Sequence, residues 1–382
     1  MLSAEALSAG KLLAALMEAG LEADILAGEP QRPLDGSTFW GDLFPAVRRL
    51  PAGADGPRRG IQVPFVSSGT GDPWPRELER AVTARLSSGE GGKPDFLLVR
   101  FPPADSLLIA CKLLRETPVP IVACVGDVLD VADLSKHLKS LRRELPRLAL
   151  LVFPCQRLLD YYVKDLRIDV SRNSIVVPHV GWGGSLSQTS PEASGPIRLL
   201  HIGALRGAGR TQAAVHLLEA FRHASDHRVG RYPKTHLILV GDEDPEVITA
   251  VSRFGLDEIV SVRPPVSYED SLGLLIQADA LVLLEGEFEE GVFLPSKLCD
   301  YASSGKPVLM YSPEPGTVAD LVGGSAHPGF LGQTVDGAAA GLTRFLDLCA
   351  AGRDLSAYRV PADDFLPERV AARFLEAVRK IL

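Results

Sequence analysis

The sequence is poor in the residues that build disulfide scaffolds, zinc sites and membrane spans. Its 382 residues hold only five cysteines, which lie in apolar surroundings with no CxxC pair and no histidine at ligand spacing. They are typical of reduced, buried residues in a cytoplasmic protein. No apolar run approaches the roughly 18 residues of a membrane helix, and the first twenty residues lack the basic start of a signal peptide. We therefore predict a cytoplasmic protein.

The sequence also lacks the basic excess that binding to a nucleic-acid backbone requires. The formal net charge is −8, and the first 190 residues hold equal numbers of basic and acidic residues, so the excess of acid lies in the second half. We expect no nucleic-acid partner. With 46% hydrophobic residues, the chain has a soluble composition and room for two domains.

Strand-like and helical patterns alternate along the chain. The runs that we expect to form strands are residues 96–100, 121–125, 148–153, 174–177, 198–202, 236–240, 259–262, 280–284 and 308–310. Helical patterns lie between them, for example at 107–115 and 134–145. Because this alternation is typical of parallel, doubly wound sheets, the sequence predicts an α/β fold with two Rossmann-like lobes, whose ligand cleft faces the carboxyl ends of the strands.

The two alternating halves are separated by a segment rich in glycine, serine and proline, residues 181–196. We therefore predict an N-terminal lobe over residues 1–184, a linker over 185–196, a C-terminal lobe over 197–365 and a last helix over 366–382.

The most informative segment runs from Glu285 to Asp320. An apolar strand leads into an acidic, glycine-containing loop, then into a helix opened by Pro295-Ser296 and closed by Gly305, then into a second strand. A helix N-terminus presents unpaired N–H groups and a partial positive charge, so the loop 289–291 can bring a diphosphate against backbone donors. Lys297 adds a full positive charge there.

The carboxylates of this segment suit sugar and ribose hydroxyls better than phosphate. The order of these residues resembles the donor site of two-lobed, retaining GT-B glycosyltransferases of the family-four type (group 1), and Pro295-Ser296-Lys297-Leu298 is similar to a branch met in bacterial surface-polysaccharide gene sets. In that resemblance Asp300 binds the nucleotide ribose, and Gly305 to Val308 enter the next strand. The alternative is an exposed Lys297–Asp300 pair on an ordinary helix.

The resemblance implies a set of donor-binding residues in this segment: Glu289, Glu290, Gly291, Val292, Lys297, Leu298 and Asp300. Whether Glu289 or Glu290 holds the sugar stays open, because neither has the commonest spacing from Asp300. The resemblance also implies that the turn with Pro265 and Val266 lies where the family's backbone contacts the base.

A glycine-rich turn from Gly203 to Arg210 follows one strand and opens a helix. Such a turn lets backbone groups and a guanidinium approach a diphosphate, which makes Gly203, Arg206 and Arg210 candidates. Exposed loop arginines are the alternative. The resemblance implies that an arginine and a lysine, here Arg210 and Lys297, neutralise the leaving diphosphate in place of a metal. We therefore interpret Asp242-Glu243-Asp244 as a polar loop and expect neither metal nor cofactor.

Two features of the first half bear on the acceptor. Asp127 follows the strand 121–125 and is the candidate to orient or deprotonate an acceptor hydroxyl, with a helix N-cap as the alternative. The helical pattern 134–145 has a leucine face and a basic face of Lys136, Lys139, Arg142 and Arg143. A basic amphipathic helix can lie on anionic lipid, although a solvated face is the alternative.

Together these features predict a metal-independent retaining glycosyltransferase, cytoplasmic or peripheral on the inner face of the membrane. It would move a sugar from a nucleoside-diphosphate sugar to a saccharide or lipid-linked saccharide in surface-glycan synthesis. The resemblance implies that the last helix crosses back to the N-terminal lobe and that the family's first strand and glycine turn are missing before the helical pattern at 4–19. A reduced, non-catalytic partner subunit and a nucleotide-sugar epimerase or hydrolase of the same fold are the alternatives.

Overall fold

The computed structural model describes residues 4–23, 26–28, 48–50, 74–88, 93–102, 104–128, 131–181, 196–226 and 235–382. The chain divides into two compact units. The N-terminal unit comprises Ser3–Pro178 with Glu368–Leu382, and the C-terminal unit comprises His179–Pro367 with Met1–Leu2. Apart from Pro196, the predicted linker lies outside the described residues.

The N-terminal unit is built on a parallel sheet whose strands follow one another in chain order. These strands are β3 (Leu97–Phe101), β4 (Ile121–Val125), β5 (Leu150–Phe153) and β6 (Ser174–Val176). The central strands β4 and β5 are buried along their whole length, as parallel strands covered on both faces must be. A separate parallel pair is formed by β1 (Leu26–Gly28) and β2 (Arg48–Leu50).

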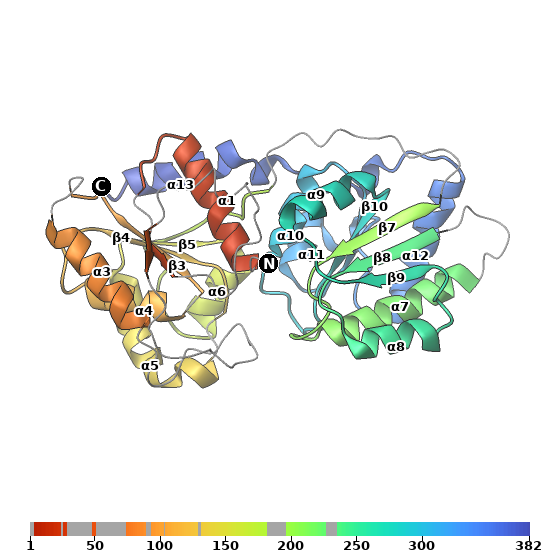
Figure 1. Cartoon of the computed structure of the whole chain (residues 1–382), viewed down its shortest axis with the longest axis horizontal. Helices are drawn as coiled ribbons and strands as arrows, with labels where there is room; N and C mark the ends of the chain where they lie inside the picture. The colour runs from red at the N-terminus through yellow and green to blue at the C-terminus, as the bar shows by residue number, and fades with distance from the viewer. Residues whose placement is uncertain are drawn as a thin grey trace. The chain divides into compact units, whose positions relative to one another are not determined.

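Helices cover both faces of this sheet. They are α1 (Ala4–Glu18), α3 (Trp74–Ser88), α4 (Ala104–Leu113), α5 (Val131–Glu144), α6 (Gln156–Lys164) and α13 (Pro367–Arg379), with a short 3-10 turn at Leu145–Arg147. Figure 1 shows α1 and α13 on the side of the sheet opposite α4 and α5. The last helix, α13, belongs to this unit, so the chain returns to its first lobe as predicted.

The C-terminal unit holds a five-stranded parallel sheet with a change of direction in its middle. Its strands are β7 (Ile197–Ile202), β8 (Thr235–Val240), β9 (Val260–Arg263), β10 (Ala280–Leu284) and β11 (Val308–Tyr311). Their order in space is β11-β10-β7-β8-β9. The chain runs outward from β7 to β9 and then returns to place β10 on the other side of β7. This creates a topological switch point between the carboxyl ends of β7 and β10.

Helices α7 (Arg210–Asp226), α8 (Pro245–Arg253) and α12 (Val335–Ala350) lie on one face of this sheet, and α9 (Tyr268–Gln277) and α10 (Ser296–Ser303) lie on the other (Figure 1). Right-handed crossovers require this division, since the chain reverses its direction across the sheet after β9. The remaining short elements are α11 (Thr317–Val322) and the 3-10 turns Gly324–Ala326, Ser356–Tyr358 and Asp363–Phe365.

The core of the C-terminal unit lies between the sheet and these helices. Leu218, Phe221 and Phe345 are fully buried on α7 and α12, against Leu199 and Leu239 of the sheet. Burial of each such side chain contributes about 1.5–3 kcal/mol. On α10, Leu298, Tyr301 and Ala302 are all buried, so this helix packs an apolar face into the core.

All nine strands that the sequence predicts are present. The bounds of β4 and β10 are those predicted, and the other seven begin and end within two residues of the predicted ones. Four of these strands, β4, β5, β10 and β11, are buried along their whole length and are apolar throughout, so their sequences reveal them.

Candidate functional site

Three loops of the C-terminal unit meet at the carboxyl ends of β7, β10 and β11. Loop 203–209 is tied to loop 285–295 by the N–H of Glu287, which donates to the Gly209 carbonyl (3.3 Å). Loop 285–295 is tied to loop 312–316 by the N–H of Gly291, which donates to the Pro315 carbonyl (3.0 Å). Helices α7 and α10 begin at the ends of two of these loops, so their N-termini border the same place.

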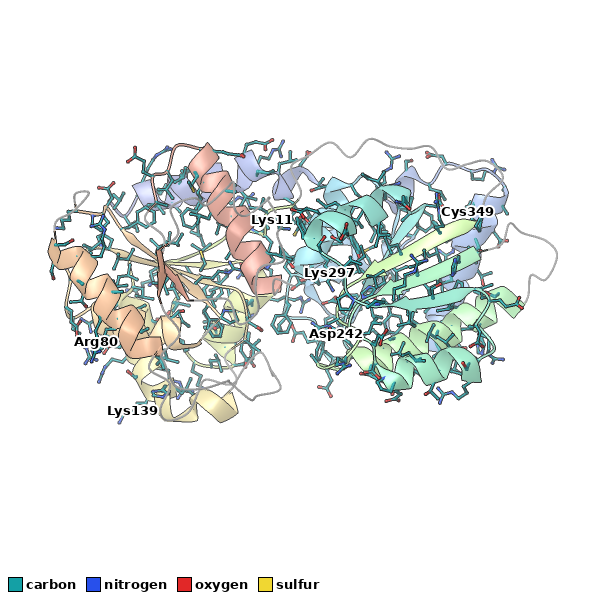
Figure 2. All side chains as sticks on the ribbon, viewed as in Figure 1. Lys11, Arg80, Lys139, Asp242, Lys297 and Cys349 are labelled. Carbon is teal, nitrogen blue, oxygen red and sulfur yellow. The ribbon has the colours of Figure 1, made fainter. Side chains whose placement is uncertain are left out.

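Lys297, on the first turn of α10, reaches across to the loop that follows β7. A Cβ built on Gly203 would lie 1.6 Å from Lys297 Nζ, and Gly203 has a φ of +149°. Glycine is favoured at position 203, because other residues rarely adopt this φ and a side chain there would displace the ammonium group. Figure 2 labels Lys297 among the side chains near the ends of these strands.

Lys297 and Arg210 form the positive part of the site. Among the residues that the structure describes, neither makes a hydrogen bond or an ion pair with another side chain. Burial, and next the charge of Arg210, lower the pKa of Lys297 from 10.5 to about 8, while Glu285 acts in the opposite direction. Two cations held near each other without a bonded anion are costly, and an anionic ligand would remove that cost.

Glu285 follows β10 directly and is 8% exposed. Its Oε2 accepts a hydrogen bond from the hydroxyl of Ser312, the residue that follows β11. Burial raises the pKa of Glu285 from 4.5 to about 7, although the Ser312 hydroxyl and the charges of Arg210 and Lys297 act to lower it. This carboxyl can therefore gain or lose its proton near neutral pH.

His201, near the end of β7, is a neutral member of the same cluster. It is fully buried, and its Nδ1 donates to the Val282 carbonyl on β10 (2.9 Å). Burial, followed by the charge of Lys297, lowers the pKa of His201 to about 3. The ring therefore stays uncharged at neutral pH and adds no further positive charge beside the two cations.

Asp300 lies on α10 one turn after Lys297 and is 9% exposed. Tyr268, the first residue of α9, points its hydroxyl at Asp300 Oδ1 at a long 3.5 Å. Burial and then the charge of Asp300 raise the pKa of Tyr268. Because Asp300 is buried, the alternative of an exposed Lys297–Asp300 surface pair does not describe it.

Tyr301 fixes the orientation of α10 relative to the sheet. Its hydroxyl accepts a hydrogen bond from the N–H of Ile202 at the end of β7 (3.1 Å), and the ring is 1% exposed. One face of α10 is thus held in the core while Lys297 reaches Gly203, after β7.

The other predicted donor-binding residues of this segment differ in their burial. Glu289 and Glu290 are exposed in the loop before α10, Gly291 is buried and Val292 is half-buried. Gly291 lies against Gly316, where the two backbones bridge. Leu298 is fully buried, so its side chain belongs to the core.

Three further candidate residues lie toward the β8 and β9 end of the same sheet edge. Arg206 is exposed, and its guanidinium donates to the carbonyl of Glu243 in the loop after β8. Pro265 and Val266 follow the edge strand β9 and precede α9. The loop that carries Pro265 and Val266 thus leads directly into Tyr268.

The Asp242-Glu243-Asp244 loop follows β8 and Gly241. Asp244 caps α8, since its Oδ1 accepts from the N–H of Glu246 (2.9 Å), and its Oδ2 accepts from the Thr211 hydroxyl (2.9 Å). Both carboxylate oxygens of Asp244 therefore have protein donors. In the part of the chain that the structure describes, no three His, Cys, Asp or Glu side chains are grouped as metal ligands.

Asp127 lies in the N-terminal unit, after β4. Its Oδ1 accepts from the N–H of Val128 (2.7 Å), and its carbonyl accepts from the Tyr162 hydroxyl (3.0 Å). On α5, the predicted leucine face is buried at Leu141, while Lys139 is exposed. Arg142 donates through Nε to the Leu166 carbonyl (2.8 Å), so part of the basic face is used within the protein.

Sequence reasoning did not select Glu285, His201 or Ser312. The signal was present for Glu285, because a carboxylate directly after an apolar strand lies at the carboxyl edge of a parallel sheet. His201 and Ser312 become meaningful only once β7, β10 and β11 are known to be neighbours.

Comparison with solved structures identifies the fold. The chain is similar to a glycosyltransferase from Rickettsia africae ESF-5, with 13% identity, a TM-score of 0.65, and coverage of 100% of this chain and 96% of that chain. It is also similar to Anabaena Alr3699/HepE in complex with UDP, with 15% identity, a TM-score of 0.62 and coverage of 98% and 94%.

A third similar structure, from Listeria monocytogenes, is assigned as a UDP-N-acetylglucosamine 2-epimerase, with 12% identity, a TM-score of 0.59 and coverage of 98% and 92%. Together these similarities show an α/β fold of two Rossmann-like lobes, the GT-B fold. No family model and no curated protein sequence matches the chain. None of the helices that the structure describes is long and apolar enough to cross a membrane.

Proposed function

We propose that the protein is a glycosyltransferase that moves a sugar from a nucleoside-diphosphate sugar to a hydroxyl acceptor, with retention and without a metal. The observation that carries this proposal is the pair Lys297 and Arg210. They lie beside two helix N-termini at the switch point of a Rossmann-like sheet. The carboxyl ends of strands at a switch point are where open α/β sheets bind their ligands.

The chemistry follows from the charges. When the bond between the anomeric carbon and the diphosphate oxygen breaks, the leaving nucleoside diphosphate gains negative charge. Lys297, Arg210 and the N-termini of α7 and α10 would stabilise that charge, and we expect this stabilisation to supply most of the rate enhancement. The acceptor hydroxyl attacks the oxocarbenium-like anomeric carbon from the same face, and its proton passes to the departing phosphate oxygen.

The remaining residues take roles in substrate binding. Asp300 would accept from a ribose hydroxyl, Glu289 or Glu290 from the sugar, and the backbone at Pro265 and Val266 would contact the base. The N-terminal lobe would bind the acceptor, with Asp127 orienting its hydroxyl. The similarity to the Anabaena protein solved with UDP supports a nucleotide ligand in the C-terminal lobe.

We further infer a cytoplasmic enzyme of bacterial surface-glycan or related glycoconjugate synthesis, whose acceptor is a saccharide or a lipid-linked saccharide. The exposed basic residues of α5 support contact with an anionic membrane surface. The support is partial, because Arg142 and Arg143 also bond to groups of the protein itself.

Calorimetry with UDP, GDP and ADP, followed by donor turnover with a panel of glycan acceptors, tests the proposal. We expect one nucleotide to bind, turnover to require an acceptor, and EDTA to change neither. Binding of none of the three would overturn it. Activity lost with EDTA and restored by magnesium would return the Asp242-to-Asp244 loop to consideration as a metal site.

A nucleotide-sugar epimerase or hydrolase is the second candidate, favoured by the similarity to the Listeria protein assigned as an epimerase. Glu285, buried and able to titrate near neutral pH, is a group that could move a proton in such a reaction. Consumption or epimerisation of the donor without any acceptor would support this candidate. Binding without any turnover would indicate a non-catalytic partner subunit.

A further inference from the structure

Glu285 is set apart from the other carboxylates of the site by its surroundings. It is 8% exposed, whereas Glu289 and Glu290 in the same loop are exposed and suited to contact hydroxyl groups in water. Among the described residues, its carboxylate accepts one hydrogen bond, from Ser312. A buried carboxylate with so few donors is poorly stabilised in its charged form.

Glu285 interacts with groups from three other elements of the unit. Lys297 on α10 and Arg210 at the start of α7 are the cations that interact with it, and Ser312 after β11 is its hydrogen-bond donor. His201 on β7 is neutral. The neighbouring acid Glu287 is turned to other partners, because its Oε1 binds His216 and accepts from the Tyr311 hydroxyl (3.1 Å).

The protonation of Glu285 therefore sets the charge that a ligand meets. With Glu285 ionised, the cluster of Glu285, Lys297 and Arg210 carries one net positive charge, and with Glu285 neutral it carries two. A diphosphate that approaches the two cations also approaches the carboxylate that is coupled to them.

We propose that Glu285 is a positioning residue of the diphosphate site, whose negative charge opposes the nucleotide, so that the nucleotide binds to the neutral form and is released more readily as Glu285 ionises. This inference rests on the proposed function and assigns a role to a residue that does not touch the reacting atoms. Its pKa of about 7 places the change within the pH range in which enzymes work.

The test compares nucleotide affinity in wild type and Glu285→Gln at about pH 6 and about pH 7.5 by calorimetry, with whichever of UDP, GDP and ADP binds the wild type. Lys297, with a pKa of about 8, is still largely charged at both. The amide keeps an oxygen that can accept from Ser312 and removes the charge. We expect equal affinities at the acidic pH and binding about threefold tighter in Glu285→Gln at the alkaline pH, because only there is the wild-type carboxylate largely ionised. A merely structural role would weaken binding at both pH values.

Glu287→Gln is the matched control, since it makes the same chemical change two residues away in a side chain turned to His216 and Tyr311. The ratio of its affinity to that of wild type should not change with pH. Ser312→Ala provides a second variant. It removes the donor that favours the ionised form, so it should also tighten binding at alkaline pH, by less than Glu285→Gln does.

The outcomes separate the two proposals. Failure of the wild type to bind any of the three nucleotides would overturn the proposed function and this inference with it. If the wild type binds a nucleotide and Glu285→Gln binds it no more tightly than wild type at alkaline pH, the inference alone is overturned. If Glu285→Gln does not fold, unchanged affinity in a folded Ser312→Ala at alkaline pH would overturn it as well.

Discussion

Two buried glutamates, one in each unit, show two opposite ways in which a protein can surround a buried carboxylate. Glu144, the last residue of α5, is 1% exposed and binds Arg115, Arg143 and Arg147, which together lower its pKa to about 2. Glu285 is 8% exposed, accepts from one serine hydroxyl and has its pKa raised to about 7. Both glutamates have cations nearby.

The difference lies in how the cations reach the carboxylate. The arginines around Glu144 are 55%, 66% and 55% exposed, so they donate hydrogen bonds while keeping contact with water. Lys297 and Arg210 act on Glu285 through their charge, without a hydrogen bond among the described residues. Glu144 is thereby satisfied and structural, whereas the groups around Glu285 keep unused bonding capacity that a ligand can fill.

The largest effect on turnover should come from removing a cation of the C-terminal unit. Removing an arginine around Glu144 in the N-terminal unit should leave turnover unchanged. Lys297→Ala or Arg210→Ala should lower turnover about a hundredfold or more, because each loses a donor to the charge of the leaving diphosphate. Steady-state kinetics on the folded variants measures this. Arg147→Ala is the control, and equal losses of turnover in Arg147→Ala and Lys297→Ala would break the comparison.

Replacing each glutamate by glutamine should change stability in opposite directions. Glu285 has a folded pKa of about 7 against an ordinary 4.5, so its contribution to stability falls as pH rises between these values. Glu285→Gln should therefore be more stable than wild type at about pH 8, by up to about 3 kcal/mol in the free energy of unfolding. At about pH 4.5 the two proteins should be about equally stable.

Glu144 has a folded pKa of about 2, so its stabilisation is present above 4.5 and is lost as pH falls toward 2. Glu144→Gln should be less stable than wild type at neutral pH by about 1–2 kcal/mol, given that the arginines are exposed. Thermal unfolding followed by circular dichroism measures both variants. Shifts of the same sign in Glu144→Gln and Glu285→Gln at about pH 8 would contradict the contrast.

The second buried acid of the site, Asp300, should control nucleotide affinity. Asp300→Ala should weaken binding by about 1.5–3 kcal/mol, the value of a charge-assisted hydrogen bond to a ribose hydroxyl. Tyr268→Phe should weaken it less, because it removes only the hydroxyl directed at Asp300. Calorimetry decides, and unchanged affinity in Asp300→Ala would remove this residue from the site.

His201 should make the C-terminal unit sensitive to acid. Its folded pKa of about 3 lies below the ordinary 6.5, so stability is full above 6.5 and is lost as pH falls from there toward 3. His201→Asn keeps a donor for the Val282 carbonyl and removes the titration. Between about pH 7 and pH 5 it should lose about 2 kcal/mol less stability than wild type, as thermal unfolding would show.

The smallest effect per residue is expected on the surface of α5. Each basic side chain near an anionic membrane contributes about 1 kcal/mol, screened by salt. Changing Lys136, Lys139, Arg142 and Arg143 to Gln should abolish sedimentation with anionic vesicles at low salt and leave nucleotide affinity intact. A wild type that does not sediment at low salt would show that this face is merely solvated.

The sequence alone determined the strands of the four- and five-stranded sheets, the α/β class and the position of the acidic loop before α10. Buried parallel strands are apolar throughout, and the helix from Ser296 to Ser303 carries its own start and stop signals, so local patterns were sufficient. The same patterns selected Lys297 and Arg210 as candidates, because a charge beside a glycine-rich turn or a helix start can be read directly from the sequence. Asp300 was selected by the resemblance to the GT-B donor site.

Only the tertiary structure decided which of these groups interact. Lys297 and Gly203 are far apart in the chain, and their close approach follows from β10 lying beside β7. The same neighbourhood buries Glu285 and brings Ser312 to it. Burial and the distance between charges set a pKa, and both depend on the order of strands in the sheet, which no local pattern of residues contains.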